Sequence, residues 1–228
     1  MFSLICFENS NFILIIFSSL VPILIWLSFV LKEDPHKEPV FFIFIALLLG
    51  GLAGIFSYFL EFALSRSVSV ESVSYYLISA FIEEFLKFIL ILVLIFPTKY
   101  FDEAIDAMIY MGISALGFAF LENIGNLCSS IMVSGALGMM VVAGLRFLGA
   151  NFLHLLASTL IGFGYAITYK TRRILPFLIS FFIASSLHFL YNMFIIEKDI
   201  AVYMFPILWA VFFITLKEYQ IIKLRNGE

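Results

Sequence analysis

Apolar stretches long enough to cross a lipid bilayer follow one another along almost the whole chain, with short polar connections between them. A helix needs about 20 apolar residues to cross the hydrocarbon core of a membrane. An open sheet cannot satisfy its backbone hydrogen bonds in lipid, so each stretch is predicted to be a helix. The predicted spans are Asn11–Leu31, Val40–Phe62, Tyr75–Phe96, Ala104–Asn123, Phe147–Tyr169, Ile174–Ile196 and Ile200–Leu216.

The stretch between Asn123 and Arg146 does not fit this pattern. Its apolar part, residues 131–145, is short and contains three glycines. It fits an eighth span, a re-entrant helix or an interfacial helix. The positions of Lys and Arg discriminate between these alternatives, because the cytoplasmic side of a membrane protein carries the excess of positive charge.

Seven spans with an external N-terminus place most of the basic residues inside. The inner set is Lys32, Lys37, Lys99, Lys170, Arg172, Arg173, Lys217, Lys223 and Arg225, and the outer set is Arg66, Arg146 and Lys198. Eight spans would leave most of them outside. The sequence therefore predicts an all-α transmembrane bundle of about seven spans, or eight if the ambiguous stretch crosses. A short re-entrant or interfacial segment near residues 126–146 is expected, with the C-terminus in the cytoplasm.

Composition agrees with this architecture. The chain has 228 residues, of which 63% are hydrophobic and 13% charged, whereas soluble domains are roughly half apolar and one quarter charged. No polar stretch is long enough to form a separate soluble domain, so residues 1–228 are expected to form one integral-membrane domain. Cys6 and Cys128 are too few and too far apart in the sequence to indicate a disulfide or a metal motif.

The third predicted span contains charged residues in an otherwise apolar run: Glu83, Glu84 and Lys87. A charge near the centre of a span costs at least about 2.5–3.5 kcal/mol, and such residues are usually functional. Lys87 is close enough along the helix to pair with either glutamate. Neighbouring residues on a helix point about 100° apart. One glutamate can therefore line a site while the other pairs with Lys87.

Three other predicted spans carry polar residues. Glu122 ends the fourth span, His154 precedes Ser158 by four residues in the fifth, and His188 precedes Asn192 by four in the sixth. Residues at this spacing share a helix face, so each histidine has a polar neighbour. A structural role, with each histidine satisfied inside the bundle and Glu122 at a helix end, is the alternative interpretation.

The predicted depths of these residues agree. With a rise of about 1.5 Å per residue, Glu83 and His188 lie roughly 12 Å below the external ends of their helices, and His154 roughly 10 Å below. Glu122 is expected close to the external surface. The sequence thus predicts one polar site in the external half of the membrane.

Carboxylates and imidazoles in one pocket allow two kinds of chemistry. They can bind a divalent metal, zinc being the expected one, or a glutamate can activate water while histidine and asparagine stabilise the oxyanion. Both lead to hydrolysis. The competing class is transport, because buried acids and histidines also form proton or cation relays.

A series of motifs in a fixed order extends from the first loop to the sixth span. It consists of Asp34-Pro-His-Lys-Glu-Pro39, Glu83-Glu84-x-x-Lys87, residues 101–110, residues 117–123, Arg146, His154-x-x-x-Ser158 and His188-x-x-x-Asn192. In this order they resemble the PrsW-type intramembrane proteases, which are related to the CAAX prenyl endopeptidases and the bacteriocin-processing (Abi) proteins. The CAAX group has His where this chain has Glu122.

The resemblance implies an intramembrane endopeptidase in a bacterial or archaeal membrane. Its partners would be the lipid bilayer and a membrane-anchored protein similar to an anti-sigma factor, cut near the external face, and no nucleic acid is expected. The catalytic candidates are Glu83, Glu84, Glu122, His154, His188 and Asn192, supported by Lys87 and Ser158. A bound metal would be held by Glu83, Glu122, His154 and His188. A transporter and a non-catalytic immunity or chaperone protein of the same fold are the alternatives.

Overall fold

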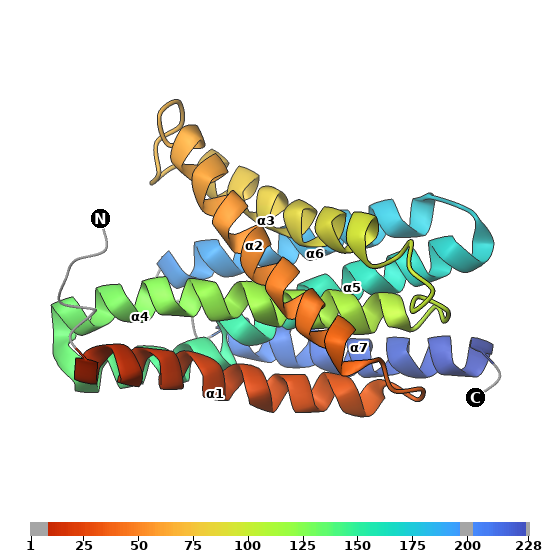
Figure 1. Cartoon of the computed structure of the whole chain (residues 1–228). Coiled ribbons are helices and arrows are strands. Elements are labelled where there is room, and N and C mark those ends of the chain that lie inside the picture. The colour runs from red at the N-terminus through yellow and green to blue at the C-terminus, as the bar shows by residue number, and fades with distance from the viewer. Residues whose placement is uncertain (1–8, 197–202, 227–228) are drawn as a thin grey trace.

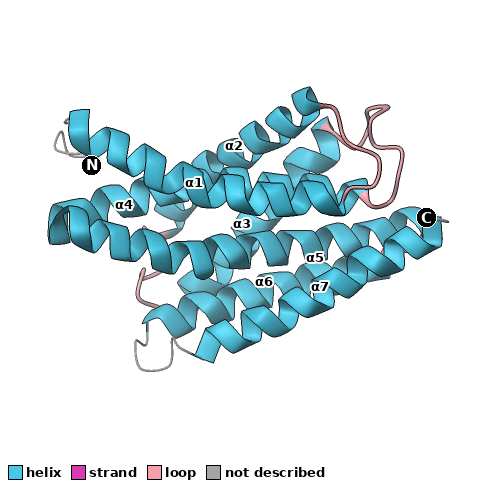
Figure 2. Ribbon diagram, turned by 90° about the horizontal axis from the view of Figure 1, so that it is seen from below, coloured by secondary structure: helices cyan, strands magenta, loops and turns pink. Residues whose placement is uncertain are grey.

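The computed structural model describes residues 9–196 and 203–226, and these residues form helices joined by loops (Figures 1 and 2). No strand occurs among them, so the predicted all-α class is confirmed. The helices are α1 (Asn9–Glu33), α2 (Val40–Leu64), α3 (Val73–Leu94), α4 (Asp106–Leu148), α5 (Ala150–Thr171), α6 (Leu175–Ile196) and α7 (Met204–Asn226). The start of the predicted last span, Ile200, lies outside the described residues.

Length and hydropathy mark five segments of the described chain as candidate membrane spans, so the protein is a polytopic helical membrane protein. One of them, Asp106–Thr171, covers both α4 and α5. Helix α3 is not among the candidates, and it is the helix that carries the three charged residues of the predicted site. Large apolar side chains such as Phe17, Phe59 and Phe182 are exposed on the outer faces of the bundle, as expected of surfaces that contact lipid.

Helix α4 differs most from the prediction. It does not end at Asn123 but continues to Gly135, which has φ 67° and ψ −173°, and a second helical arm returns from there to Leu148. A residue with a side chain is strained at this φ, whereas glycine adopts it readily. Arg146 Nε donates a hydrogen bond to Asn123 Oδ1 at 2.6 Å, which holds the returning arm beside the first arm. The segment expected to be short and re-entrant or interfacial is therefore the tip and return of a helical hairpin.

Two loops and the C-terminal helix share one end of the bundle. Lys223 Nζ on α7 lies 3.0 Å from Glu33 Oε2 at the end of α1. In the loops, His36 Nδ1 lies 2.6 Å from Glu103 Oε1. Figures 1 and 2 show the first described residues of α1 and the turn of α4 at the opposite end.

The core is built around the first half of α4, which is buried from Asp106 to Ala119. Helix α2 crosses it at two glycines. A Cβ atom on Gly117 would lie 2.0 Å from the carbonyl oxygen of Leu47, and one on Gly50 would lie 1.8 Å from that of Ser114. Small residues permit this close approach of membrane helices, so the α2–α4 contact depends on them.

Cys128, in the first arm of α4, is disulfide-bonded. Sequence spacing gave no indication of this bond, because the separation of cysteines along the chain says nothing about their separation in the fold. The only other cysteine of the chain, Cys6, lies outside the described residues.

Candidate active site

Helix α3 positions two carboxylates with different surroundings. Its N-terminus is capped by Ser72, whose Oγ accepts from the Tyr75 amide at 3.2 Å. Three turns later, Glu84 points into the protein and is fully buried, whereas Glu83 faces a cavity. The different surroundings follow from the 100° angle between neighbouring residues on a helix.

Both carboxylate oxygens of Glu84 accept hydrogen bonds from other side chains. Its Oε1 accepts from Lys87 Nζ at 2.6 Å and from His188 Nδ1 at 2.9 Å. Its Oε2 accepts from Ser158 Oγ at 2.9 Å. A carboxylate held by charged and neutral donors on three helices is suited to orienting its partners rather than to attacking a substrate.

Glu83 has the opposite character. Its Oε2 is buried without a hydrogen-bond partner among the described residues, and it lies 3.7 Å from His188 Nε2. Glu83, His154 and His188 each offer one ligand atom, and these atoms lie within 4.8 Å of one another. A buried carboxylate oxygen that is unpaired costs free energy unless a proton or a cation satisfies it.

His154 connects α5 to both α3 and α4. Its Nδ1 lies 3.1 Å from Lys87 Nζ, and its Nε2 lies 2.8 Å from Glu122 Oε2. The ring also packs against Phe118, with centroids 5.1 Å apart. Both ring nitrogens are therefore occupied by protein groups.

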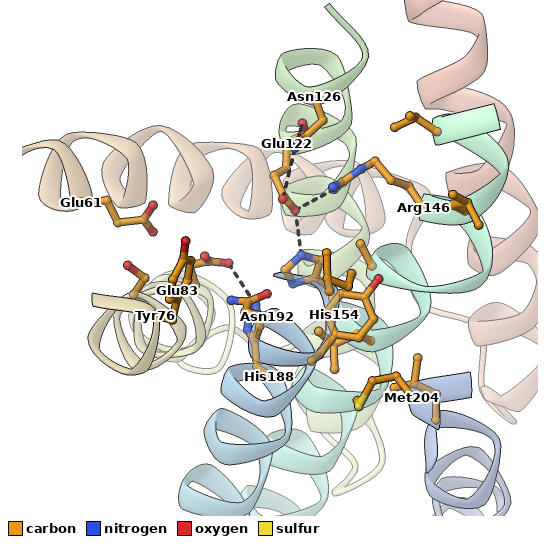
Figure 3. Close-up of a pocket in the computed structure, with 18 of the residues that line it drawn as sticks. Glu61, Tyr76, Glu83, Glu122, Asn126, Arg146, His154, His188, Asn192 and Met204 are labelled. Atoms are coloured by element: carbon orange, nitrogen blue, oxygen red, sulfur yellow. Dashed lines mark hydrogen bonds and ion pairs between the residues drawn. The ribbon is translucent and has the colours of Figure 1, made fainter. Parts of the chain in front are cut away.

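Glu122 is held by the returning arm of α4. Arg146 Nη2 lies 2.9 Å from Glu122 Oε2, and Asn126 Nδ2 lies 3.3 Å from Oε1 (Figure 3). The sequence placed Glu122 at the end of its helix, but α4 continues for about 20 Å beyond it to the turn at Gly135. The hairpin tip, rather than Glu122, forms the end of this helix.

The site opens into a cavity of about 600 Å³. Figure 3 shows Glu83, Glu122, His154, His188 and Asn192 around it. The other lining residues are mainly apolar or aromatic and come from α3, α4, α5, α6 and α7; they include Tyr76, Leu145, Leu153, Tyr191, Ile195, Met204, Phe205 and Leu208.

Glu61, on α2, lines the same cavity and was not singled out from the sequence. Ser57 Oγ donates to its Oε1 at 2.6 Å. Its position near the end of the second predicted span resembles that of an ordinary charge at a helix end. An acidic residue one turn after a serine in a run that is otherwise apolar was the available signal.

The residues fit a metal ion. His188 is backed by a carboxylate at Nδ1, which is the usual arrangement behind a metal-ligating histidine. Its Nε2 faces the unpaired Oε2 of Glu83 across 3.7 Å. Imidazole nitrogen and carboxylate oxygen are common zinc ligands, and catalytic zinc sites use three protein ligands. Glu83 and His188 supply two, and His154 is the third residue of this group. Glu122, also predicted as a ligand, contacts His154 Nε2 and Arg146 instead.

The fold and the site together define a polytopic membrane protein with a carboxylate–imidazole centre inside its helix bundle. Residues 38–216 match the family model described as PrsW family intramembrane metalloprotease, and the chain belongs to this family. The predicted resemblance is thus confirmed.

Curated relatives named Protease PrsW are similar to the chain. That of Geobacillus kaustophilus is 27% identical over 196 residues, which cover 80% of this chain and 81% of the relative. That of Bacillus subtilis is 33% identical over 99 residues (42% and 45%), and that of Oceanobacillus iheyensis 30% over 113 (48% and 52%). The chain thus spans about half the length of the last two. No solved structure matches it significantly.

Proposed function

We propose that the protein is an intramembrane metalloprotease that hydrolyses a peptide bond of a membrane-anchored protein. The observation that carries this proposal is the pairing of Glu83 Oε2 with His188 Nε2 across 3.7 Å at the wall of a cavity. Glu83 Oε2, which has no hydrogen-bond partner among the described residues, and the imidazole nitrogen facing it could together hold a cation, a proton or a water molecule. Membership of the metalloprotease family supports the same activity.

Glu83 is the reacting carboxylate in this proposal, because of the two adjacent glutamates it alone has a carboxylate oxygen without a hydrogen-bond partner among the described residues. It would be a ligand where zinc is bound, and the general base where water is activated without a metal. Glu84 holds His188 and Lys87 in place. A zinc ion bound by Glu83 and His188, with His154 or Glu122 as a further ligand, would polarise the scissile carbonyl and lower the pKa of its bound water. The side-chain amide of Asn192 lines the cavity and donates to the oxyanion that develops during attack.

The site lies in the external half of the membrane in this proposal. Seven crossings are supported when α1, α2, α3, α6 and α7 each cross once. The first arm of α4 then crosses outward, and its returning arm together with α5 crosses inward. The inner end then carries Glu33, Lys223 and the loop that contains His36. The disulfide at Cys128 supports an external location for the hairpin end, because disulfides persist on the oxidising side of a membrane.

The lining of the cavity supports a substrate that is itself embedded in the membrane. Tyr191, Phe205 and Leu208 offer an apolar wall beside Glu83 and His188. A segment of a membrane-anchored protein, of the anti-sigma-factor type, has the apolar side chains that match this wall. An entirely polar peptide would lose hydration there without compensation.

Transport remains the second candidate because of one observation. Hydrogen bonds and ion pairs form a chain of groups from Glu122 through His154, Lys87 and Glu84 to His188. Such a chain is suited to passing protons.

The test uses a single-span reporter protein cut at its external side, with the wild-type protein and Glu83→Gln in the same membranes. Glu83→Gln is expected to abolish cleavage at unchanged expression, and a strong chelator is expected to abolish wild-type cleavage until zinc is restored. Cleavage that survives Glu83→Gln would remove Glu83 from the mechanism. Proton flux into proteoliposomes that both Glu83→Gln and His154→Ala abolish, without any proteolysis by the wild type, would establish the transport alternative.

A further inference from the structure

The two histidines of the site meet edge to face, with ring centroids 4.8 Å apart and planes at 89°. Both are buried, and both use Nδ1 to contact the pair formed by Glu84 and Lys87. They contact different members of that pair. One ring therefore has a donor behind it and the other an acceptor.

His154 has a donor behind it. Lys87 Nζ, 2.6 Å from Glu84 Oε1, is an ammonium group and has only protons to offer. His154 Nδ1, at 3.1 Å, must therefore accept. A neutral imidazole that accepts at Nδ1 carries its proton on Nε2, and that proton points at Glu122 Oε2, 2.8 Å away.

His188 has an acceptor behind it. Glu84 Oε1, at 2.9 Å, accepts from His188 Nδ1, so this nitrogen carries the proton. Nε2 is then left with a free lone pair, and it faces Glu83 Oε2. The hydrogen bond to the carboxylate also orients the ring.

We propose that the buried Glu84–Lys87 pair holds His154 and His188 in opposite tautomers and thereby gives them different tasks. His188 is the nitrogen ligand or proton acceptor of the site. His154 is a hydrogen-bond donor that fixes Glu122 and is not a metal ligand through Nε2. Lys87 is a positioning residue, because its donor leaves His154 Nδ1 only the role of acceptor, and Glu122 Oε2 requires the same tautomer from the other side of the ring. The statement on the metal rests on the proposed function, whereas the tautomers do not.

This assignment accounts for the charge that is most expensive to bury. Lys87 is fully buried in a membrane helix, and its Nζ lies 4.4 Å from the centroid of the Phe118 ring. The ring face and the carboxylate of Glu84 stabilise an ammonium group there. An apolar residue would fill the same space at lower cost, but it would leave His154 Nδ1 without its donor.

Nitrogen NMR tests the tautomers directly, because the chain has only three histidines. The full-length protein is labelled with 15N-histidine, placed in lipid nanodiscs and measured with a chelator present. The His36→Gln variant identifies the resonances of the exposed third ring. Protonated and unprotonated ring nitrogens resonate far apart. The expected pattern is one buried ring protonated at Nε2 and one at Nδ1, with His154→Gln and His188→Gln removing them in turn.

Lys87→Met is expected to keep the proton of His154 on Nε2, because Glu122 still accepts from it, and to shift the Nδ1 resonance, because Nδ1 loses its donor. Lys87→Arg, which still presents donors, is expected to retain the wild-type pattern. If Lys87→Met does not fold, the wild-type spectrum still decides. The same tautomer in both buried rings, or His154 protonated at Nδ1 in the wild type, overturns the proposal. An unchanged His154 signal in folded Lys87→Met overturns the role of Lys87.

Zinc titration tests the division of tasks without any activity measurement. His154→Gln keeps an amide donor near the position of Nε2 and is expected to retain zinc affinity within about threefold. His188→Gln is expected to lose at least about 100-fold, more than the 10–100-fold typical of an outer partner. Equal losses in both variants overturn the assignment of His154. A wild-type protein that binds no zinc removes the metal from the proposed function, and the NMR pattern then decides the tautomers alone.

Discussion

Glu84 Oε1 and His188 Nδ1 lie 2.9 Å apart, although the two residues are separated by 104 positions in the chain. This contact links α3 to α6 at the centre of the bundle. It also distinguishes the two adjacent glutamates. Both carboxylate oxygens of Glu84 accept hydrogen bonds, whereas Glu83 Oε2 has no hydrogen-bond partner among the described residues.

Replacement of the two glutamates by glutamine should have different effects on stability. Glu84→Gln puts an amide among three donors and breaks the ion pair of a fully buried lysine, so a loss of about 3–5 kcal/mol is expected. Glu83→Gln removes no hydrogen bond of Oε2 and should change the free energy of unfolding by less than about 1 kcal/mol. Unfolding in detergent, followed by circular dichroism, measures both. A Glu83→Gln variant as unstable as Glu84→Gln would contradict the assignment.

Ser158→Ala tests the support of Glu84 from α5. The substitution removes the donor to Oε2, and the buried oxygen it leaves should cost about 1–3 kcal/mol. Cleavage should fall by about 10–100-fold, as for other partners that orient site residues. Ser185→Ala is the matched control, because the Ser185 hydroxyl is buried but makes no hydrogen bond within the described chain. Equal effects of the two variants would remove Ser158 from the support of the site.

Arg146→Gln should release the returning arm of α4. The guanidinium is bound to Glu122 and Asn123, and a neutral amide of shorter reach cannot replace both contacts. Hydrogen exchange of residues 136–148 should become faster, and cleavage should fall by at least about tenfold. Arg146→Lys keeps the charge but lacks the planar guanidinium group. Its exchange and cleavage rates are expected to lie between those of the wild type and Arg146→Gln. Unchanged exchange in Arg146→Gln would show that the arm is held by its apolar contacts alone.

Gly117→Ala tests the close crossing of α2 and α4. The added Cβ atom would lie 2.0 Å from a backbone oxygen, so the helices must separate, at a cost of at least about 1–3 kcal/mol. Gly125→Ala on the same helix has open space around its Cβ position, and it should be neutral or slightly stabilising. Melting temperatures of the two variants provide the measurement. Similar values would show that the helices separate without cost.

A carboxyl group in the first loop predicts a dependence of stability on pH. Burial raises the pKa of Glu38 to about 7, while Tyr110 donates a hydrogen bond to it and Asp34 adds like charge nearby. The folded state therefore binds a proton more tightly than the unfolded state does. The free energy of unfolding should therefore be unaffected by this group below about pH 4.5, and should decrease as the pH rises to about 7.

Melting temperatures between pH 5 and pH 8 test this dependence. Glu38→Gln, which stays neutral, should make the decrease smaller, and Glu71→Gln in the exposed loop before α3 is the control. A wild-type protein whose stability rises over this range would contradict the sign. Equal slopes in the wild type and Glu38→Gln would assign the dependence to other groups.

The sequence by itself determined the helical membrane architecture and the residue types of the site. Runs of apolar residues near 20 in length leave a chain no alternative to helices in lipid, and charged residues inside them are too costly to be incidental. Glu83, Glu122, His154 and His188 could therefore be selected without coordinates, and the structure brings their side chains together.

The tertiary structure decided which groups these residues contact. Which of Glu83 and Glu84 faces the cavity depends on the rotation of α3 about its axis, and hydropathy is insensitive to a rotation of about 100°. The turn at Gly135 depends on a backbone angle that glycine permits but does not require. The partners at the ring nitrogens of His154 and His188 lie on other helices. Only packing brings such groups within hydrogen-bonding distance, because no local pattern encodes a contact between residues so far apart in the chain.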